Sequence, residues 1–178
     1  AINITGNASA SWGFYIRSTS KIQTTSGAIT IIGNAPTNVW GGHLGAVDVL
    51  SSSGAIVIDG KTSWGISAGY NATTNIGAIS PATSTSNVQV IGNAYGESTY
   101  ATAVNYRTTG SVIIESTGTK FLATPNIVSE SFTGNSSVRI GKSTNDSAVT
   151  VRGTASIVGD YTVYGGAITQ RSEEHTSE

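Results

Sequence analysis

The sequence predicts an all-β fold, a parallel β-helix in which residues 1–170 form stacked coils of about 24–32 residues each. Two observations predict it. A short apolar motif recurs along the whole chain at nearly constant spacing. Alternation of apolar and polar residues at a period of two, which is typical of strands, recurs with the motif, whereas helical periodicity never extends beyond a few residues.

The recurring motif contains two apolar residues two positions apart, often followed by glycine, as in "ITIIG" and "IVIDG". Its first residues are Ile2, Ile29, Ile56, Val88, Val112, Val138 and Ile168. The first two intervals are equal, the third is the longest and the fourth is the shortest. In the first six copies the residue two positions on is also Ile or Val, namely Ile4, Ile31, Ile58, Val90, Ile114 and Ile140. These β-branched residues favour strands.

The remaining length of each repeat has room for further strands. "AVTVRG" and "YTVYGG" follow "SVRIG" at spacings of about ten residues, so we expect three short strands and three turns per coil. The connecting segments are rich in Gly, Asn, Ser and Thr, which suit tight turns, and Pro36, Pro81 and Pro125 lie outside the motifs.

Stacking is expected because a repeat this short cannot bury its own apolar face. Successive coils would place Ile above Ile, with strands roughly 4.8 Å apart. An antiparallel sandwich is the alternative, since many short strands at regular spacing also describe that class. A sandwich does not require self-similar strands, so the recurrence favours the solenoid.

The composition excludes several function classes. Only 11% of the 178 residues are charged, against about 25% in typical soluble domains, and the formal net charge is −1. We therefore expect no nucleic-acid partner. Cysteine is absent, so there is no thiolate nucleophile or cysteine-ligated zinc. No apolar run reaches the length of a transmembrane helix, so membrane insertion is not expected.

Both ends of the sequence indicate an interior fragment. The chain opens on "AINITG", without methionine, as though already inside a repeat. Its last eight residues, "RSEEHTSE", hold three of the ten acidic residues and match the in-frame translation of a common sequencing adapter. We expect a β-helix segment over 1–170, truncated at both ends, and no contribution of 171–178 to the fold.

Motifs such as "SGAITIIGN", "SGAIVIDGK" and "GSVIIESTG", with intervening "SWGFYI" and "TSWGIS", resemble the repeats of filamentous-haemagglutinin-like adhesins. Similar repeats occur in autotransporter passengers. The resemblance covers essentially 1–170 and implies a right-handed β-helical fibre at the bacterial cell surface, associated with the outer membrane, or secreted. It implies attachment to receptors or glycans on host cells, other bacteria or matrix, and export of the full-length protein through an outer-membrane partner by two-partner secretion.

Catalysis by a β-helix would need clustered carboxylates. Without the last eight residues the acids are Asp48, Asp59, Glu97, Glu115, Glu130, Asp146 and Asp160. They are widely separated in the sequence, and the position one repeat length after Asp59 is Ser86. We therefore expect no catalytic residues and no enzyme. A β-helix enzyme acting on polysaccharides, or a phage-tail-like glycan-binding module, is the alternative.

Two lysines follow glycine as in a phosphate-binding loop, but the spacing fails. That loop needs a second glycine five positions before the first, where the chain has Ala55 and Ser136. We expect Lys61 and Lys142 to be exposed at turns after strands, and no nucleotide cofactor.

A metal site is not expected either. "GGHLGAVD", from Gly41 to Asp48, has the wrong spacing for a calcium-binding nonapeptide and occurs once. His43 has no His or Cys nearby in the sequence, so we expect a surface histidine that binds no metal.

The three tryptophans, Trp12, Trp40 and Trp64, are each followed by glycine. We expect them to fill coil corners or to stack on one another; the alternative is that they bind sugar rings or a protein partner. An ice-binding surface would need threonines in register, but the positions after the first motif residues are Asn3, Thr30, Val57, Gln89, Ile113, Arg139 and Thr169. The sequence singles out no ligand-binding residue.

Overall fold

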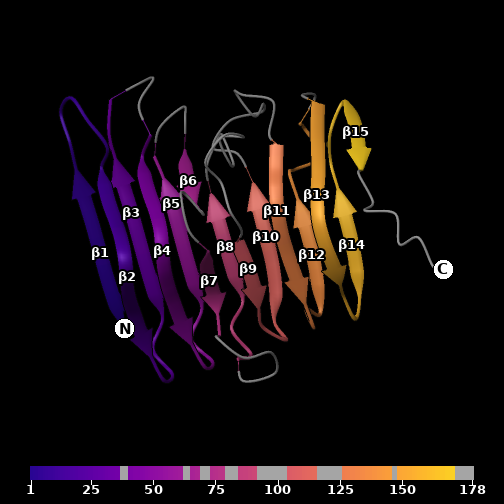
Figure 1. The fold of residues 1–178 in the computed structure, drawn as a ribbon, viewed down its shortest axis with the longest axis horizontal. Coiled ribbons are helices and arrows are strands. Elements are labelled where there is room, and N and C mark those ends of the chain that lie inside the picture. Colours follow the sequence, from indigo (N-terminus) through magenta and orange to yellow (C-terminus); the bar gives the residue numbers. More distant parts are fainter. Residues whose placement is uncertain are drawn as a thin grey trace.

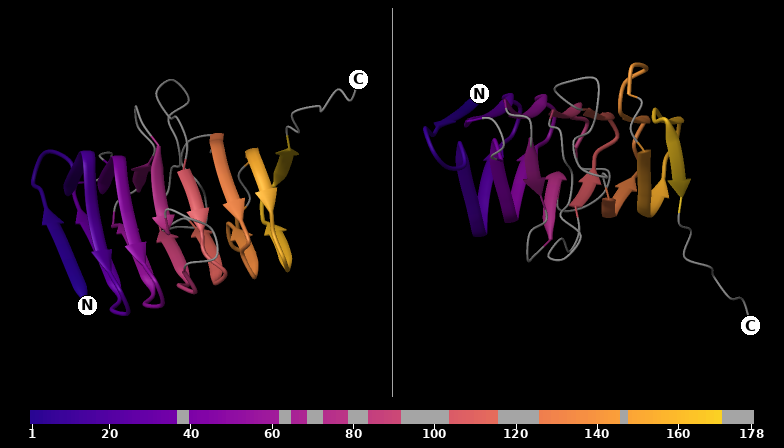
Figure 2. Two further views of the ribbon diagram at one scale, coloured as in Figure 1. Left: turned by 60° about the horizontal axis from the view of Figure 1, so that its bottom comes forward. Right: turned by 90° about the horizontal axis from the view of Figure 1, so that it is seen from above.

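The computed structural model is all-β, with parallel sheets and stacked coils, and confirms the predicted solenoid class (Figure 1). The structure describes residues 1–36, 40–61, 65–68, 73–78, 84–91, 104–115, 126–145 and 148–170. The terminal octapeptide 171–178 lies outside these ranges, so its exclusion from the fold stays a prediction. The coils stack along the long axis of the molecule, and their strands form two sheets (Figure 2).

One sheet, here called the aliphatic sheet, contains seven strands that all pair in parallel. In spatial order they are β1 (Ile2–Asn7), β3 (Ile29–Asn34), β5 (Ile56–Gly60), β8 (Val88–Ile91), β10 (Ser111–Glu115), β12 (Ser137–Ile140) and β14 (Asp160–Val163). Spatial order follows chain order, so each coil adds one strand beside the last.

The other sheet, here called the bent sheet, contains eight strands. In spatial order they are β2 (Phe14–Thr24), β4 (Gly42–Ser51), β7 (Thr74–Gly77), β9 (Val104–Arg107), β11 (Asn126–Thr133), β13 (Ala148–Ser156) and β15 (Ala167–Gln170), with β6 (Ile66–Ala68) also on β4. In this order β6 and β7 pair with the first and second parts of β4.

The predicted repeat register is confirmed for the first six motif copies. Ile2 pairs with Ile29 and Ile29 with Ile56, and the same column continues through Val88, Val112 and Val138. The seventh assignment is wrong. Val138 pairs with Tyr161 of β14, whereas Ile168 lies on β15 in the bent sheet. "YTV" also has apolar residues at i and i+2, so it continues the column one strand earlier than "ITQ".

The prediction of three strands per coil fits the coil that contains β5, β6 and β7, but it is wrong for the first two coils, in which a single long strand replaces two of the expected three. β2 and β4 each cover what would be two strands joined by a turn. Their register shifts between Arg17 and Ser20, where Ser18 and Thr19 lie opposite Ala46. The extra residue forms a β-bulge, and a bulge bends a strand without ending it.

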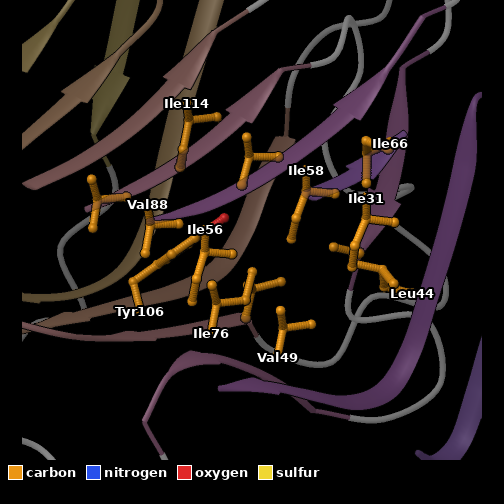
Figure 3. Packing of buried hydrophobic residues seen from close by; sticks show 14 of the residues in the cluster. Ile31, Leu44, Val49, Ile56, Ile58, Ile66, Ile76, Val88, Tyr106 and Ile114 are labelled. Atoms are coloured by element: carbon orange, nitrogen blue, oxygen red, sulfur yellow. The ribbon is translucent and has the colours of Figure 1, made fainter. Parts of the chain in front are cut away.

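The core lies between the two sheets. The inner columns of the aliphatic sheet are almost fully buried, with Ile29, Ile31, Ile56 and Ile58 at 0% exposure. Figure 3 shows Ile31, Ile56, Ile58 and Ile114 on the same side of the core as Val88, with Leu44, Val49, Ile76 and Tyr106 of the bent sheet packed nearby. In the bent sheet, the inner column that contains Val49 and Ile76 continues as aromatic rings, because Tyr106 follows Ile76 and stacks on Phe132 at 5.2 Å between centroids.

Glycine pairs close the corner between the two sheets. A Cβ on Gly33 would lie 1.8 Å from the carbonyl oxygen of Gly41, and a Cβ on Gly6 would lie 1.7 Å from that of Gly13. No side chain fits where two backbones approach this closely. The contact explains two features of the sequence at once: the glycine that closes the first two copies of the motif and the glycine that follows Trp12 and Trp40.

At another corner, buried hydroxyl and amide groups donate hydrogen bonds to backbone carbonyls of the preceding coil. Ser86 Oγ donates to the carbonyl of Ser51 (2.9 Å), Thr108 Oγ1 to that of Ser86 (2.7 Å), and Asn135 Nδ2 to that of Thr108 (2.9 Å). These side chains satisfy carbonyls that face the interior of the turn. In the described residues no helix is long and apolar enough to cross a membrane.

Candidate binding surface

Three acidic side chains in the described ranges are held by polar or cationic neighbours. Asn75 donates to Asp48 Oδ1 (2.7 Å), and Lys61 Nζ lies 2.5 Å from Asp59 Oδ2. Glu115 Oε1 accepts a hydrogen bond from Gln89 Nε2 (2.9 Å), and Glu115 Oε2 forms an ion pair with Arg139 Nη2 (3.0 Å). Asp160 is exposed. Glu97 and Asp146, and the side chain of Glu130, lie outside what the structure describes.

The register does bring two acids onto one row, contrary to the sequence-based expectation. Asp59 pairs with Ile91, and Ile91 pairs with Glu115, so the two acids lie two strands apart on the outer face of the aliphatic sheet. At about 4.8 Å per strand, their Cα atoms are roughly 10 Å apart. The expectation failed because the third interval is longer than the first two, so the register partner of Asp59 is Ile91 and not Ser86.

Glu115 has both oxygens engaged, whereas Asp59 is only 4% exposed and its Oδ1 accepts no hydrogen bond from any described residue. The outer row gives no threonine array. Its members are Asn3, Thr30, Val57, Gln89, Ile113 and Arg139, as expected, followed by Thr162 in place of Thr169.

Both lysines lie just after strands, as predicted, but the expected exposure is found for Lys61 and not for Lys142. Lys61 follows β5 and is exposed, and Lys142 follows β12 and is half-buried, after Gly141 with a φ of +79°. The residues before Gly60 and Gly141 belong to strands β5 and β12, so the described backbone leading to each lysine is extended and is not a phosphate-binding loop.

His43 is not the surface residue that the sequence predicts. It is 3% exposed, because the rings of Tyr15 and Trp12 stack on it. Burial, with the nearby Arg17 charge, lowers the pKa of His43 to about 4, so the imidazole is neutral at pH 7. In the described part of the chain, no three His, Cys, Asp or Glu side chains gather as a metal site would require.

Trp12, Tyr15, Arg17 and His43 form a cluster on the outer face of the bent sheet, here called the aromatic patch. Ring centroids are 4.8 Å apart for Trp12 and Tyr15, 4.8 Å for Tyr15 and His43, and 5.4 Å for Trp12 and His43. Trp12 and Tyr15 remain 40% and 41% exposed. The expectation that tryptophans fill corners is thus wrong for Trp12. Trp40 is half-buried, and Trp64 lies outside the described residues.

The patch follows from strand alternation and from the glycine corner. Trp12 precedes Gly13 of the glycine corner and is exposed. Phe14 and Ile16 then point inward, so Tyr15 and Arg17 point outward. Gly42 makes space for the Phe14 ring, and the register then places His43 beside Tyr15.

Arg17 is held against Tyr15. Its Nη1 donates to the phenolic oxygen of Tyr15 (2.6 Å), and its Cζ lies 5.2 Å from the centroid of that ring. Sequence reasoning missed both residues as site candidates. The available signal was "WGFYIR", in which Tyr15 and Arg17 alternate with Phe14 and Ile16 directly after a tryptophan.

Comparisons with protein-family models, with curated proteins and with solved structures gave no match to this chain.

Proposed function

We propose that this chain is a non-enzymatic shaft segment of a large bacterial adhesin, secreted or exposed at the cell surface, that mediates or presents attachment. The observation that carries this proposal is the aliphatic sheet from β1 to β14, in which every strand pairs with its equivalent in the next coil. A stack of this kind gains length without changing its cross-section, as a shaft requires. The partners we propose are receptors or glycans on host cells, bacteria or matrix, with an outer-membrane protein for export.

The chemistry of the surface supports a role without catalysis. The described carboxylates Asp48, Asp59 and Glu115 are bound by Asn75, Lys61 and Arg139 respectively. A polar surface with a net charge near zero does not attract nucleic acid strongly, which is compatible with a role in attachment to other surfaces.

Attachment can be tested on the purified chain. Beads coated with it would be incubated with epithelial cells, bacterial cells and matrix-coated plates, with albumin-coated beads as control. We expect retention several-fold above the control on at least one surface, and an elongated particle by small-angle X-ray scattering. Retention equal to albumin on all three surfaces would overturn the attachment role.

A polysaccharide-acting enzyme is the second candidate, and the shared row of Asp59 and Glu115 is the observation that favours it. Paired carboxylates flank the scissile bond in most glycoside hydrolases. Wild-type chain would be incubated with neutral and acidic polysaccharides while new reducing ends are measured, with Asp59→Asn and Glu115→Gln as controls. We expect no release; release that both substitutions abolish would replace the shaft with the enzyme.

A further inference from the structure

The aromatic patch has an exposure that packing does not explain. Its two large rings, Trp12 and Tyr15, are each about two-fifths open to solvent, whereas Phe14, next to Tyr15 in the same strand, is 7% exposed. Stacking among Trp12, Tyr15 and His43 holds the rings in one arrangement. Aromatic side chains presented rigidly at a surface are typical of binding sites, since little conformational freedom is lost when a ligand contacts them.

The backbone beside the patch is unusual in the same place. Ser18, Thr19 and Ala46 have φ values of 69°, 55° and 55°, and in the described ranges they are the residues other than glycine with positive φ. All three lie in the bulge that begins directly after Arg17. Conformations this unfavourable persist where the surrounding structure holds them, and they concentrate at functional sites.

The patch is also positively charged. Arg17 is exposed and makes no ion pair with any described residue, and its side-chain hydrogen bond to Tyr15 leaves other guanidinium N–H groups free to donate. Lys21, beyond the bulge, is exposed as well. The nearest acid in the register is Asp48, opposite Lys21, which accepts a hydrogen bond from Asn75. His43 is neutral at pH 7 and adds no charge.

We propose that the aromatic patch binds an acidic glycan, with the apolar face of a sugar ring against Trp12 and Tyr15 and the sugar carboxylate on the Arg17 guanidinium. The C–H face of a pyranose fits the negative face of an aromatic ring, and a guanidinium binds a carboxylate through two parallel hydrogen bonds. A nucleic acid would need a wider basic surface than one arginine and one lysine provide. The link from this binding to attachment rests on the proposed function, but the site itself does not.

The test uses the whole chain and two matched probes, an oligogalacturonate and its methyl ester, which differ in the carboxylate charge. Binding would be followed by tryptophan fluorescence and by calorimetry. We expect saturable binding of the acid form, at least tenfold weaker binding of the ester, and at least tenfold weaker binding of the acid form to Trp12→Ala. Arg17→Gln should bring the two probes to similar affinity, and Arg17→Lys should recover part of the difference.

Lys142→Gln serves as a control for loss of a positive charge away from the patch, and circular dichroism verifies that each variant is folded. Absence of saturable binding, or binding that Trp12→Ala and Arg17→Gln leave unchanged, would overturn the proposal. Tighter binding of an oligothymidylate than of the oligogalacturonate would also overturn it. Bead retention by Arg17→Gln equal to wild type, with no oligogalacturonate binding by either protein, would refute the patch while leaving the shaft function intact.

Discussion

The two sheets are built from the same coils, but they differ in how regularly their inner residues and their strand register repeat. In the aliphatic sheet an inner position keeps an aliphatic residue from Ile2 through Ile29, Ile56 and Val88 to Val138, and its strands pair without register shifts. In the bent sheet the inner residues change from Phe14 to Gly42 to Ile66, and the register shifts in β2 and β11. The aliphatic sheet therefore maintains the stack of coils, whereas the bent sheet varies from coil to coil and carries the aromatic patch on its outer face.

The largest loss of stability is expected from a substitution in the inner column of the aliphatic sheet. Replacing Ile58 by alanine removes a fully buried side chain between Ile31 and Val90, where the neighbouring coils cannot collapse into the cavity. We expect a loss of about 2–5 kcal/mol in the free energy of unfolding, measured by urea denaturation. Val57→Ala, at the half-buried outward position next to it, is the control, and a similar loss there would show that the inner column has no special role.

The next largest effect is a dependence of stability on pH, which arises from His43 in the bent sheet. The pKa of His43 is about 4 in the folded chain and about 6.5 in the unfolded chain, because burial disfavours the imidazolium. Stability from this group is complete above pH 6.5 and falls as the pH drops towards 4, since the unfolded chain binds the proton first. The fall should be about 2–3 kcal/mol between pH 7 and pH 4.5. Comparison with His43→Gln isolates it, because other groups titrate in both proteins; equal slopes would contradict this assignment.

Adding a single methyl group at the glycine corner between the two sheets should destabilise the fold. Gly33→Ala would place a Cβ against the backbone carbonyl of Gly41, so the two strands must move apart. We expect a loss of about 1–3 kcal/mol in thermal or urea unfolding. Thr30→Ala, on the outer face of the same strand, should change little, and a Gly33→Ala variant as stable as wild type would show that the corner can yield.

The smallest effect concerns the outer face of the bent sheet. Asn75 donates to Asp48 and accepts from Asn105, which links three coils (2.7 and 2.9 Å). Asn75→Ala should cost about 1 kcal/mol, since these groups are half-buried and water replaces part of each bond. A double-mutant cycle with Asp48→Ala measures the coupling, and additive losses would mean that the two side chains do not stabilise each other.

The difference between the sheets also explains how much the sequence could predict. A column that repeats its residue type is visible as periodicity, so Ile2 to Val138 were assigned correctly. Tyr161 was missed because an aromatic residue replaced the aliphatic one, and "ITQ" imitated the motif. The repeat of the bent sheet is not visible in the sequence, because paired inner positions hold unlike residues: the Phe14 ring fills the space that a side chain at Gly42 would occupy. Adjacency along the chain suggests Tyr15 and Arg17, but their contact with His43 depends on the register between strands of two successive coils.

The parallel pairing has a mechanical consequence. The strands lie across the long axis, so the hydrogen bonds between coils run along it (Figure 1). Tension along that axis would act on all the interfaces between coils in series, so the weakest interface would open first, and each coil released would add its contour length to the chain. Because each coil pairs mainly with its immediate neighbours, the rest of the stack stays folded meanwhile. A chain built this way would yield in small steps under load, and the aromatic patch, which spans the first two coils, would stay intact until one of those coils opened.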